Sequence, residues 1–230
     1  MKNKKDVCVI VQARTGSTRV PNKMLRDLGG TNLTELILQK LLLSDSIPQD
    51  NIYLAAHEPE LLDIANNLSI NTFKRSYTSA NSESSLQEIF EWHSYMNHKY
   101  DYVVMVSGCI PFIKTQTIDR FYDTYLESDN IGLFGVIKKN QYYWNSDGEL
   151  LHGWPENQKL MDTKSCDVLY EAAHALYASP LSIIRDGYFM DNNIPPKPEL
   201  FIIDESECFD IDYEWQFERA KQIIKYIVSE

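Results

Sequence analysis

Three positively charged side chains follow the first apolar run of the sequence at close spacing. The segment from Gln12 to Lys23 holds Arg14, Arg19 and Lys23 with one glycine, Gly16, and matches neither a Rossmann fingerprint nor a P-loop. A residue without a Cβ lets the backbone approach a phosphate, and the cations neutralise charge on a departing pyrophosphate. The segment therefore predicts a triphosphate-binding loop, with a solvated basic loop as the alternative.

Two aspartates near the other end of the sequence form a second candidate site. If residues 209–212 form a strand, its alternation places Asp210 and Asp212 on one face. Two carboxylates that converge in this way suit Mg²⁺ shared with substrate phosphates. For this pattern taken alone, the better alternative is that Asp212 is the N-cap of the last helix and Asp210 is solvated.

A turn and a histidine are the remaining candidates for chemistry. Cys109 lies in the turn of residues 106–112 and has no basic neighbour visible in the sequence, so we interpret it as a small buried residue and not as a nucleophile. His174 either contacts an acceptor or is a hydrogen-bonded structural histidine. The other histidines have no metal-ligand spacing, and the four cysteines lie far apart.

Alternating strands and helices must position these residues. The alternation indicates a three-layer α/β/α sandwich around a mostly parallel, Rossmann-like sheet, in which ligands bind at the carboxyl ends of the strands. Apolar runs predict strands at residues 7–11, 51–56, 70–73, 101–106, 131–137, 171–178, 200–203 and 209–212. Helical spacing predicts helices at residues 32–43, 59–66, 84–96, 117–127 and 217–227, with Asn32 and Ser84 as caps of the first and third.

Residues 138–166 interrupt this alternation with several aromatic residues and turn formers. We predict an inserted hairpin arm whose exposed aromatic side chains form a partner surface, the alternative being a long loop packed on its own domain. A proline-rich loop is expected at residues 191–198. Since no repeat, low-complexity tract or linker divides the chain, we expect residues 1–230 to form a single domain.

Composition narrows the class of protein. The chain has 230 residues, of which 43% are hydrophobic and 24% charged, as in ordinary globular domains. A net charge of -11 argues against nucleic-acid binding, which depends on clustered cations. No apolar run approaches the length of about 20 residues that a membrane span needs. Separate cysteines favour a reducing compartment, so we expect a cytoplasmic protein.

The triphosphate-binding segment resembles that of the acylneuraminate cytidylyltransferases and the related 3-deoxy-manno-octulosonate cytidylyltransferases. Their pattern A-R-x-G-S-x-x-x-P-x-K is matched by Ala13-Arg14-x-Gly16-Ser17 followed by Pro21 and Lys23. The residues at two further positions, Gln12 and Arg19, look more like those of the spore-coat and capsule members. The resemblance implies that Arg14 and Lys23 contact the triphosphate of CTP, with Ser17 and the backbone of Ala13 and Gly16 beside them.

The resemblance extends to the acidic segment and to the region between. The family ends in a D-I-D-x-x-x-D-F segment, which implies that Asp210 and Asp212 hold the catalytic Mg²⁺, with Gln216 in place of the third acid. It also implies that Arg75 lies near the cytosine and ribose and that His174 contacts the acceptor sugar; a surface arginine is the alternative for Arg75. The sequence departs from family patterns at Met24, Ser107 and Cys109.

The resemblance implies an activity and an assembly. We expect CTP and a sialic-acid-like sugar acid to give CMP-sugar and pyrophosphate, with Asp212, Arg14 and Lys23 as catalytic residues and a homodimer formed through residues 138–166. Two alternatives remain open. One is a nucleotide-sugar-dependent glycosyltransferase with an Asp-x-Asp metal site, and the other is a degenerate nucleotide-binding subunit without activity.

Overall fold

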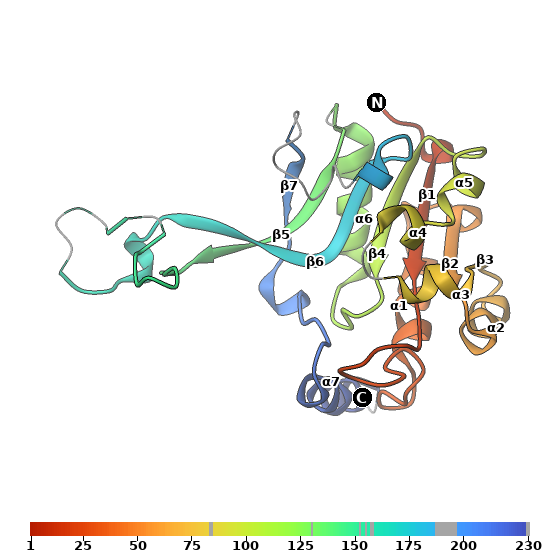
Figure 1. Cartoon of the computed structure of the whole chain (residues 1–230), viewed down its shortest axis with the longest axis horizontal. Helices are drawn as coiled ribbons and strands as arrows, with labels where there is room; N and C mark the ends of the chain where they lie inside the picture. The colour runs from red at the N-terminus through yellow and green to blue at the C-terminus, as the bar shows by residue number, and fades with distance from the viewer. Residues whose placement is uncertain are drawn as a thin grey trace.

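A seven-stranded sheet in the order β3-β2-β1-β4-β6-β5-β7 forms the centre of the computed structural model (Figure 1). The structure describes residues 1–82, 85–129, 131–151, 153, 154, 156, 159–186 and 197–228. The strands are β1 (Val7–Gln12), β2 (Ile52–Ala56), β3 (Asn71–Lys74), β4 (Tyr102–Ser107), β5 (Leu133–Asn140), β6 (Val168–Pro180) and β7 (Glu199–Ile202). β6 runs antiparallel to β4 and β5, and the other pairings are parallel.

Helices cover both faces of this sheet, which confirms the three-layer α/β/α class. The longer helices are α1 (Leu33–Leu42), α2 (Pro59–Asn67), α6 (Thr115–Glu127) and α7 (Glu214–Val228). The shorter helices are α3 (Tyr77–Asn81), α4 (Leu86–Ile89), α5 (His93–Met96) and the 3-10 turns η1 (Lys4–Asp6), η2 (Gln49–Asn51), η3 (Thr163–Ser165), η4 (Ile184–Asp186) and η5 (Glu205–Glu207). None of the helices in the described part of the chain is long and apolar enough to cross a membrane.

The central strand β1 lies between two hydrophobic cores, one on each face of the sheet. Its residues Val7 to Val11 are fully buried, as a continuous apolar run in a parallel sheet requires. Val7, Val9 and Val11 pack in the core formed with α1, α2, α6 and α7. Cys8 and Ile10 point to the opposite core, which contains Phe90 and Trp92. The end of β1 is therefore held from both sides.

One predicted helix is two short helices. The expected helix over residues 84–96 is interrupted after α4, and its cap is Ser85, whose side chain accepts from the Glu88 amide; Ser84 lies outside the described residues. Phe90 and Trp92 are both buried in the same core. Residues two apart lie on different faces of a straight helix, so burying both requires a break between them.

One predicted strand is absent. Residues 209–212 form an irregular connection between η5 and α7, so the strand expected there was wrong. The segment pairs with none of the seven strands of the sheet. Instead, the Ile211 amide donates to the carbonyl of Cys109 at 3.1 Å, which fixes the segment against the turn after β4.

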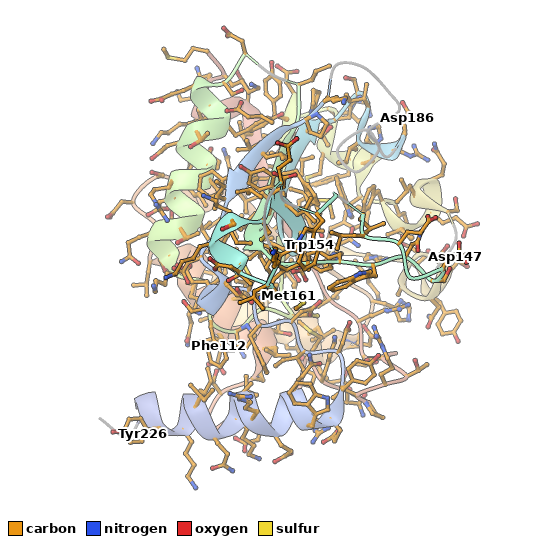
Figure 2. The ribbon with its side chains drawn as sticks, turned by 90° about the vertical axis from the view of Figure 1, so that its left-hand side faces the viewer. Phe112, Asp147, Trp154, Met161, Asp186 and Tyr226 are labelled. Carbon is orange, nitrogen blue, oxygen red and sulfur yellow. The ribbon has the colours of Figure 1, made fainter. Side chains whose placement is uncertain are left out.

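The predicted arm is present as a hairpin. β5 and β6 continue beyond the sheet as a twisted two-stranded ribbon that projects from the body of the molecule (Figure 1). Figure 2 looks along this arm, with Trp154 and Met161 in front of the sheet. The ring of Tyr142 stacks on Trp154 at 5.4 Å between centroids. The loop expected at residues 191–198 falls largely outside the described residues.

Gly29 provides the contact that seats α7 under the loop after β1. It has a φ of +81°, and a Cβ there would lie 2.8 Å from the Lys225 amide nitrogen. Gly30 has a φ of +99° but open space around it. The two neighbours therefore differ in packing while sharing a left-handed backbone.

We expect Gly29→Ala to destabilise the protein more than Gly30→Ala. Both variants incur the left-handed backbone cost of about 1–2 kcal/mol, but only Gly29→Ala must also displace the α7 backbone. Urea unfolding of the two variants measures the difference. Equal unfolding free energies would contradict the proposed role of Gly29 in seating α7.

Candidate active site

A cavity of about 610 Å³ opens at the carboxyl end of β1. Three segments distant in sequence meet around it: the loop after β1, the region from β3 to α4, and the connection before α7. The residues that line it are Gln12, Ala13, Arg14, Ser17, Thr18, Arg19, Lys23, Met24, Arg75, Ala80, Ser82, Ile89, Cys109 and Asp212. Most of the predicted site residues therefore share one cavity at the predicted edge of the sheet.

The loop after β1 is anchored by apolar residues beneath it. Val20 is fully buried, and Met24 is 3% exposed and lies against Gly108, where a Cβ would be only 2.7 Å from the Met24 Cε. Both the Thr34 amide and the Thr34 hydroxyl donate to the Met24 carbonyl. Met24, a departure from the sialic-acid enzymes, thus forms part of the floor.

A carboxylate that sequence reasoning missed fixes the front of the same loop. Glu58 Oε1 accepts from the Thr15 amide at 3.0 Å and from the Thr15 hydroxyl at 2.6 Å. Burial raises the pKa of Glu58, but the two bonds from Thr15, a backbone bond at Glu58 and the charge of His57 together lower it overall. Glu58 lies two residues after the end of β2, and an acidic residue after a strand of a parallel sheet was the available signal.

The predicted cations meet the predicted acids. Arg19 Nη2 lies 2.8 Å from Asp212 Oδ1, and Lys23 Nζ lies 3.7 Å from the same oxygen. Lys23 also donates to the carbonyl of Ile211. Next along the loop, Arg26 binds both carboxylate oxygens of Glu214, at 2.9 and 2.7 Å. These contacts join the beginning of the chain to its last helix.

Asp210 and Asp212 converge without a strand. Burial raises the pKa of Asp210, and the neighbouring charge of Asp212 adds to the increase, while Lys23, His174 and Arg19 oppose it. Asp210 Oδ1 is buried and has no hydrogen-bond partner among the described residues. The two carboxylates are therefore close enough for the charge of Asp212 to disfavour ionisation of Asp210.

Gln216 holds the acidic segment in this conformation. Its Oε1 accepts from the amides of Asp212 and Tyr213, both at 2.7 Å. This is the side-chain half of a capping box at the start of α7, where a glutamine performs as well as a glutamate. The replacement of the third family acid by glutamine is thus compatible with the cap.

Arg75 lines the cavity but is only 4% exposed. Its Nε donates to Ser79 Oγ at 3.0 Å, and its Nη2 donates to the carbonyls of Ser79 and Ile89. Burial lowers the pKa of Arg75, and the charge of Arg14 lowers it further. The alternative of a surface arginine is excluded, and Arg75 supports the wall formed by α3 and α4.

His174 lies next to the cavity, on β6. It has a φ of +51°, which is rare for a residue with a side chain, and it sits at the irregularity in the β5–β6 pairing. Its Nδ1 lies 3.3 Å from the Tyr177 hydroxyl, and its charge acts on Asp210. The contact with Tyr177 fits the alternative of a hydrogen-bonded structural histidine, and a contact with the acceptor stays a prediction.

Cys109 lies beside Lys23, a basic neighbour that the sequence order does not show. Burial nevertheless raises the pKa of the Cys109 thiol, more than Lys23 lowers it. A thiol with a raised pKa is a poor nucleophile, which agrees with the interpretation of Cys109 as a turn residue. All four cysteines are free.

The comparison with known families decides the class of protein. The sequence model described as Cytidylyltransferase matches residues 8–189, which include the loop after β1, Arg75 and His174. The chain belongs to the cytidylyltransferase family. It is accordingly a CTP-dependent nucleotidyltransferase, as the sequence motifs predict.

Curated relatives of this cytidylyltransferase are distant. Pseudaminic acid cytidylyltransferase of Campylobacter jejuni is 23% identical over 96% of this chain and 97% of its own length. 3-deoxy-manno-octulosonate cytidylyltransferase of Rickettsia prowazekii is 26% identical over 60% of this chain and 54% of its own. Spore coat polysaccharide biosynthesis protein SpsF of Bacillus subtilis is 38% identical over 26% of this chain and 25% of its own.

Solved structures show the same fold. CMP:2-keto-3-deoxy-manno-octonic acid synthetase complexed with CTP has a TM-score of 0.68 at 13% identity, over 96% of this chain and 99% of that one. 4-diphosphocytidyl-2C-methyl-D-erythritol synthase from Anaerococcus prevotii has a TM-score of 0.67 at 14% identity, over 96% and 97%. Each match covers 96% of this chain.

We expect Glu58→Gln to weaken CTP binding, because Thr15 loses a charged acceptor that positions the loop. A hydrogen bond to a charged group contributes about 1.5–3 kcal/mol, so its full loss would raise Kd roughly 10- to 150-fold, and we expect the lower end because glutamine can still accept. Calorimetric titration with CTP measures it, with Glu60→Gln on α2 as the matched control. Equal affinities in the two variants would rule out the positioning role of Glu58.

The Glu58 contact also predicts a pH dependence of stability. Since the folded-state pKa is lowered, the contact stabilises the protein above the ordinary value of 4.5 and is lost as the pH falls through the lowered pKa. The difference in unfolding free energy between wild type and Glu58→Gln should therefore shrink below pH 4.5. Acid titration of urea unfolding checks this, and a constant difference would contradict it.

Proposed function

We propose that this cytidylyltransferase activates a nonulosonic, sialic-acid-like sugar acid for surface polysaccharide or glycoconjugate synthesis. CTP and the sugar acid would give CMP-sugar and pyrophosphate. The observation that carries the proposal is the cavity lined by Arg14, Arg19 and Lys23, of which Arg19 and Lys23 pair with Asp212. The names of the relatives that act on pseudaminic and octulosonic acids support this substrate class.

The charge pairs in the cavity suggest how the residues act. Without a ligand, Arg19 and Lys23 bind Asp212. A triphosphate offers stronger acceptors, so these cations would move to its oxygens and leave Asp212 free. Arg14 and Lys23 would then stabilise the pyrophosphate as the bond between it and the α-phosphorus breaks. The anomeric hydroxyl of the sugar acid would attack the α-phosphorus directly, so the reaction needs no covalent enzyme intermediate.

The acidic pair suits a magnesium ion. Asp210 Oδ1 is a buried oxygen without a partner among the described residues, and Asp212 is held beside it. The described residues contain no group of three or more potential metal ligands, so phosphate oxygens and water would complete the coordination. Asp210 and Asp212 would hold Mg²⁺, which when bound neutralises phosphate charge and lowers the pKa of the hydroxyl.

A screen of sugar acids tests the substrate class. Purified protein with CTP, Mg²⁺ and pseudaminic, legionaminic, sialic or octulosonic acid should release pyrophosphate and give CMP-sugar, identified by mass. If CTP binds but no acid releases pyrophosphate, a non-catalytic subunit is favoured. If CMP-sugar is consumed and not formed, the protein is a glycosyltransferase.

We expect Asp212→Asn to lower kcat by more than about 100-fold, the scale of losing one electrostatic contact with developing charge. The amide keeps the shape of the side chain, so thermal unfolding should change little. Asp63→Asn, an exposed substitution on α2, is the matched control. Unchanged turnover in Asp212→Asn would remove the metal role assigned to this residue.

We further propose that the protein is a cytoplasmic homodimer joined through the arm. Large apolar side chains of the arm are exposed: Trp144, Leu151, Trp154, Leu160 and Met161. Light scattering should give a dimer for wild type and a monomer for Leu160→Glu with Met161→Glu. Leu43→Glu, at an exposed residue after α1, should remain a dimer. A monomeric wild type would overturn the assembly.

A further inference from the structure

Gln12 has a side chain whose orientation is fixed by the buried core. It is the last residue of β1, and the indole N–H of Trp92 donates to its amide oxygen. An indole nitrogen donates only, so the oxygen of Gln12 must face Trp92. Trp92 is fully buried and packs with Phe90. The NH₂ group of Gln12 is thereby held on the side away from the indole.

That NH₂ group is available to a ligand. Gln12 is half-buried and lines the active-site cavity. Among the described residues, Trp92 is the hydrogen-bond partner of its side chain, and the partner occupies the oxygen. With the oxygen turned toward the indole, the NH₂ group is the part of the amide that is left to donate to a ligand. Turning it over would face two donors toward each other and would be unfavourable.

The cavity has two ends. Arg19, Lys23 and Asp212 form a charged end suited to phosphates. Ala80 and Ile89 form another wall, where Arg14 donates to the Ala80 carbonyl at 3.2 Å and Arg75 donates to the carbonyls of Ser79 and Ile89. A nucleoside triphosphate that places its phosphates beside Arg19 and Lys23 places its base toward this wall.

Gln12 lies on the side of the wall formed by Ala80 and Ile89. Trp92 comes from the same segment as Ile89, three residues further along, so the amide of Gln12 is held on the side of that wall. We propose that Gln12, oriented by Trp92, determines base specificity by donating to N3 of cytosine. In uracil the same ring nitrogen carries a hydrogen, so a donor at this place favours CTP over UTP. This inference rests on CTP use and not on the identity of the sugar acid.

Gln12→Glu tests the inference because the indole can still donate to one carboxylate oxygen. The other oxygen then repels N3 of cytosine but accepts from N3–H of uracil. The added negative charge weakens both nucleotides alike, so the readout is the ratio of Kd values for CTP and UTP, measured by calorimetry with Mg²⁺. We expect the preference for CTP to fall by at least about tenfold.

Two further variants make the test specific. Gln116→Glu, at an exposed position on α6, adds the same charge and should keep the wild-type ratio. Trp92→Phe removes the indole donor without a change of charge and should also reduce the preference, since the amide can then turn over. Thermal unfolding shows whether Trp92→Phe is still folded. If it is not, the test rests on Gln12→Glu alone.

The outcomes separate this inference from the proposed function. If Gln12→Glu leaves the ratio of the Kd values for CTP and UTP unchanged, even though both nucleotides bind more weakly, base recognition by Gln12 is overturned. Failure of every sugar acid to release pyrophosphate would overturn the proposed substrate class alone. Because nucleotide binding is measured without an acceptor, the role of Gln12 is tested in either case.

Discussion

The joining of the loop after β1 to the connection before α7 is the constraint on which the site depends. Arg19, Lys23 and Arg26 bind Asp212, the Ile211 carbonyl and Glu214. Each exposed ion pair stabilises a protein by only about 0–1 kcal/mol, so their main effect is geometric. The cations and Asp212 neutralise one another across the cavity. The same charges are the ones that a triphosphate would use.

Much of the fold could be predicted because the periodicity of the apolar residues in the sequence agrees with their burial in the structure. The run from Val7 to Val11 is apolar on both faces, and it is the fully buried centre of the sheet. Asn32 was expected to cap a helix, and its side chain accepts from the Glu35 amide. The arm was predicted from a break in periodicity at residues 138–166. In each case local sequence and tertiary structure demand the same conformation.

The failures have a common physical origin in tertiary packing. A pattern of alternating residues at 209–212 is typical of a strand, but a strand also needs a neighbouring strand to pair with. The amides of Ile211 and Asp212 instead donate to the Cys109 carbonyl and to the Gln216 side chain. Glu58 was missed because its partner, Thr15, is distant in the sequence. For the same reason, the sequence could not predict that Lys23 lies beside Cys109. Contacts between segments, and not propensity, decide which side chains share the cavity.

The irregularity between β5 and β6 separates the arm from the site. Gly135 lies there, and a Cβ at Gly135 would be 2.9 Å from Ile203 Cδ1 and 3.1 Å from the Leu176 carbonyl oxygen. This crowding fixes the register of the two strands before they leave the sheet. We therefore expect a change in the length of the hairpin tip to leave the position of His174 unchanged. The arm and the end of the sheet that carries His174 are in this sense mechanically independent parts of one hairpin.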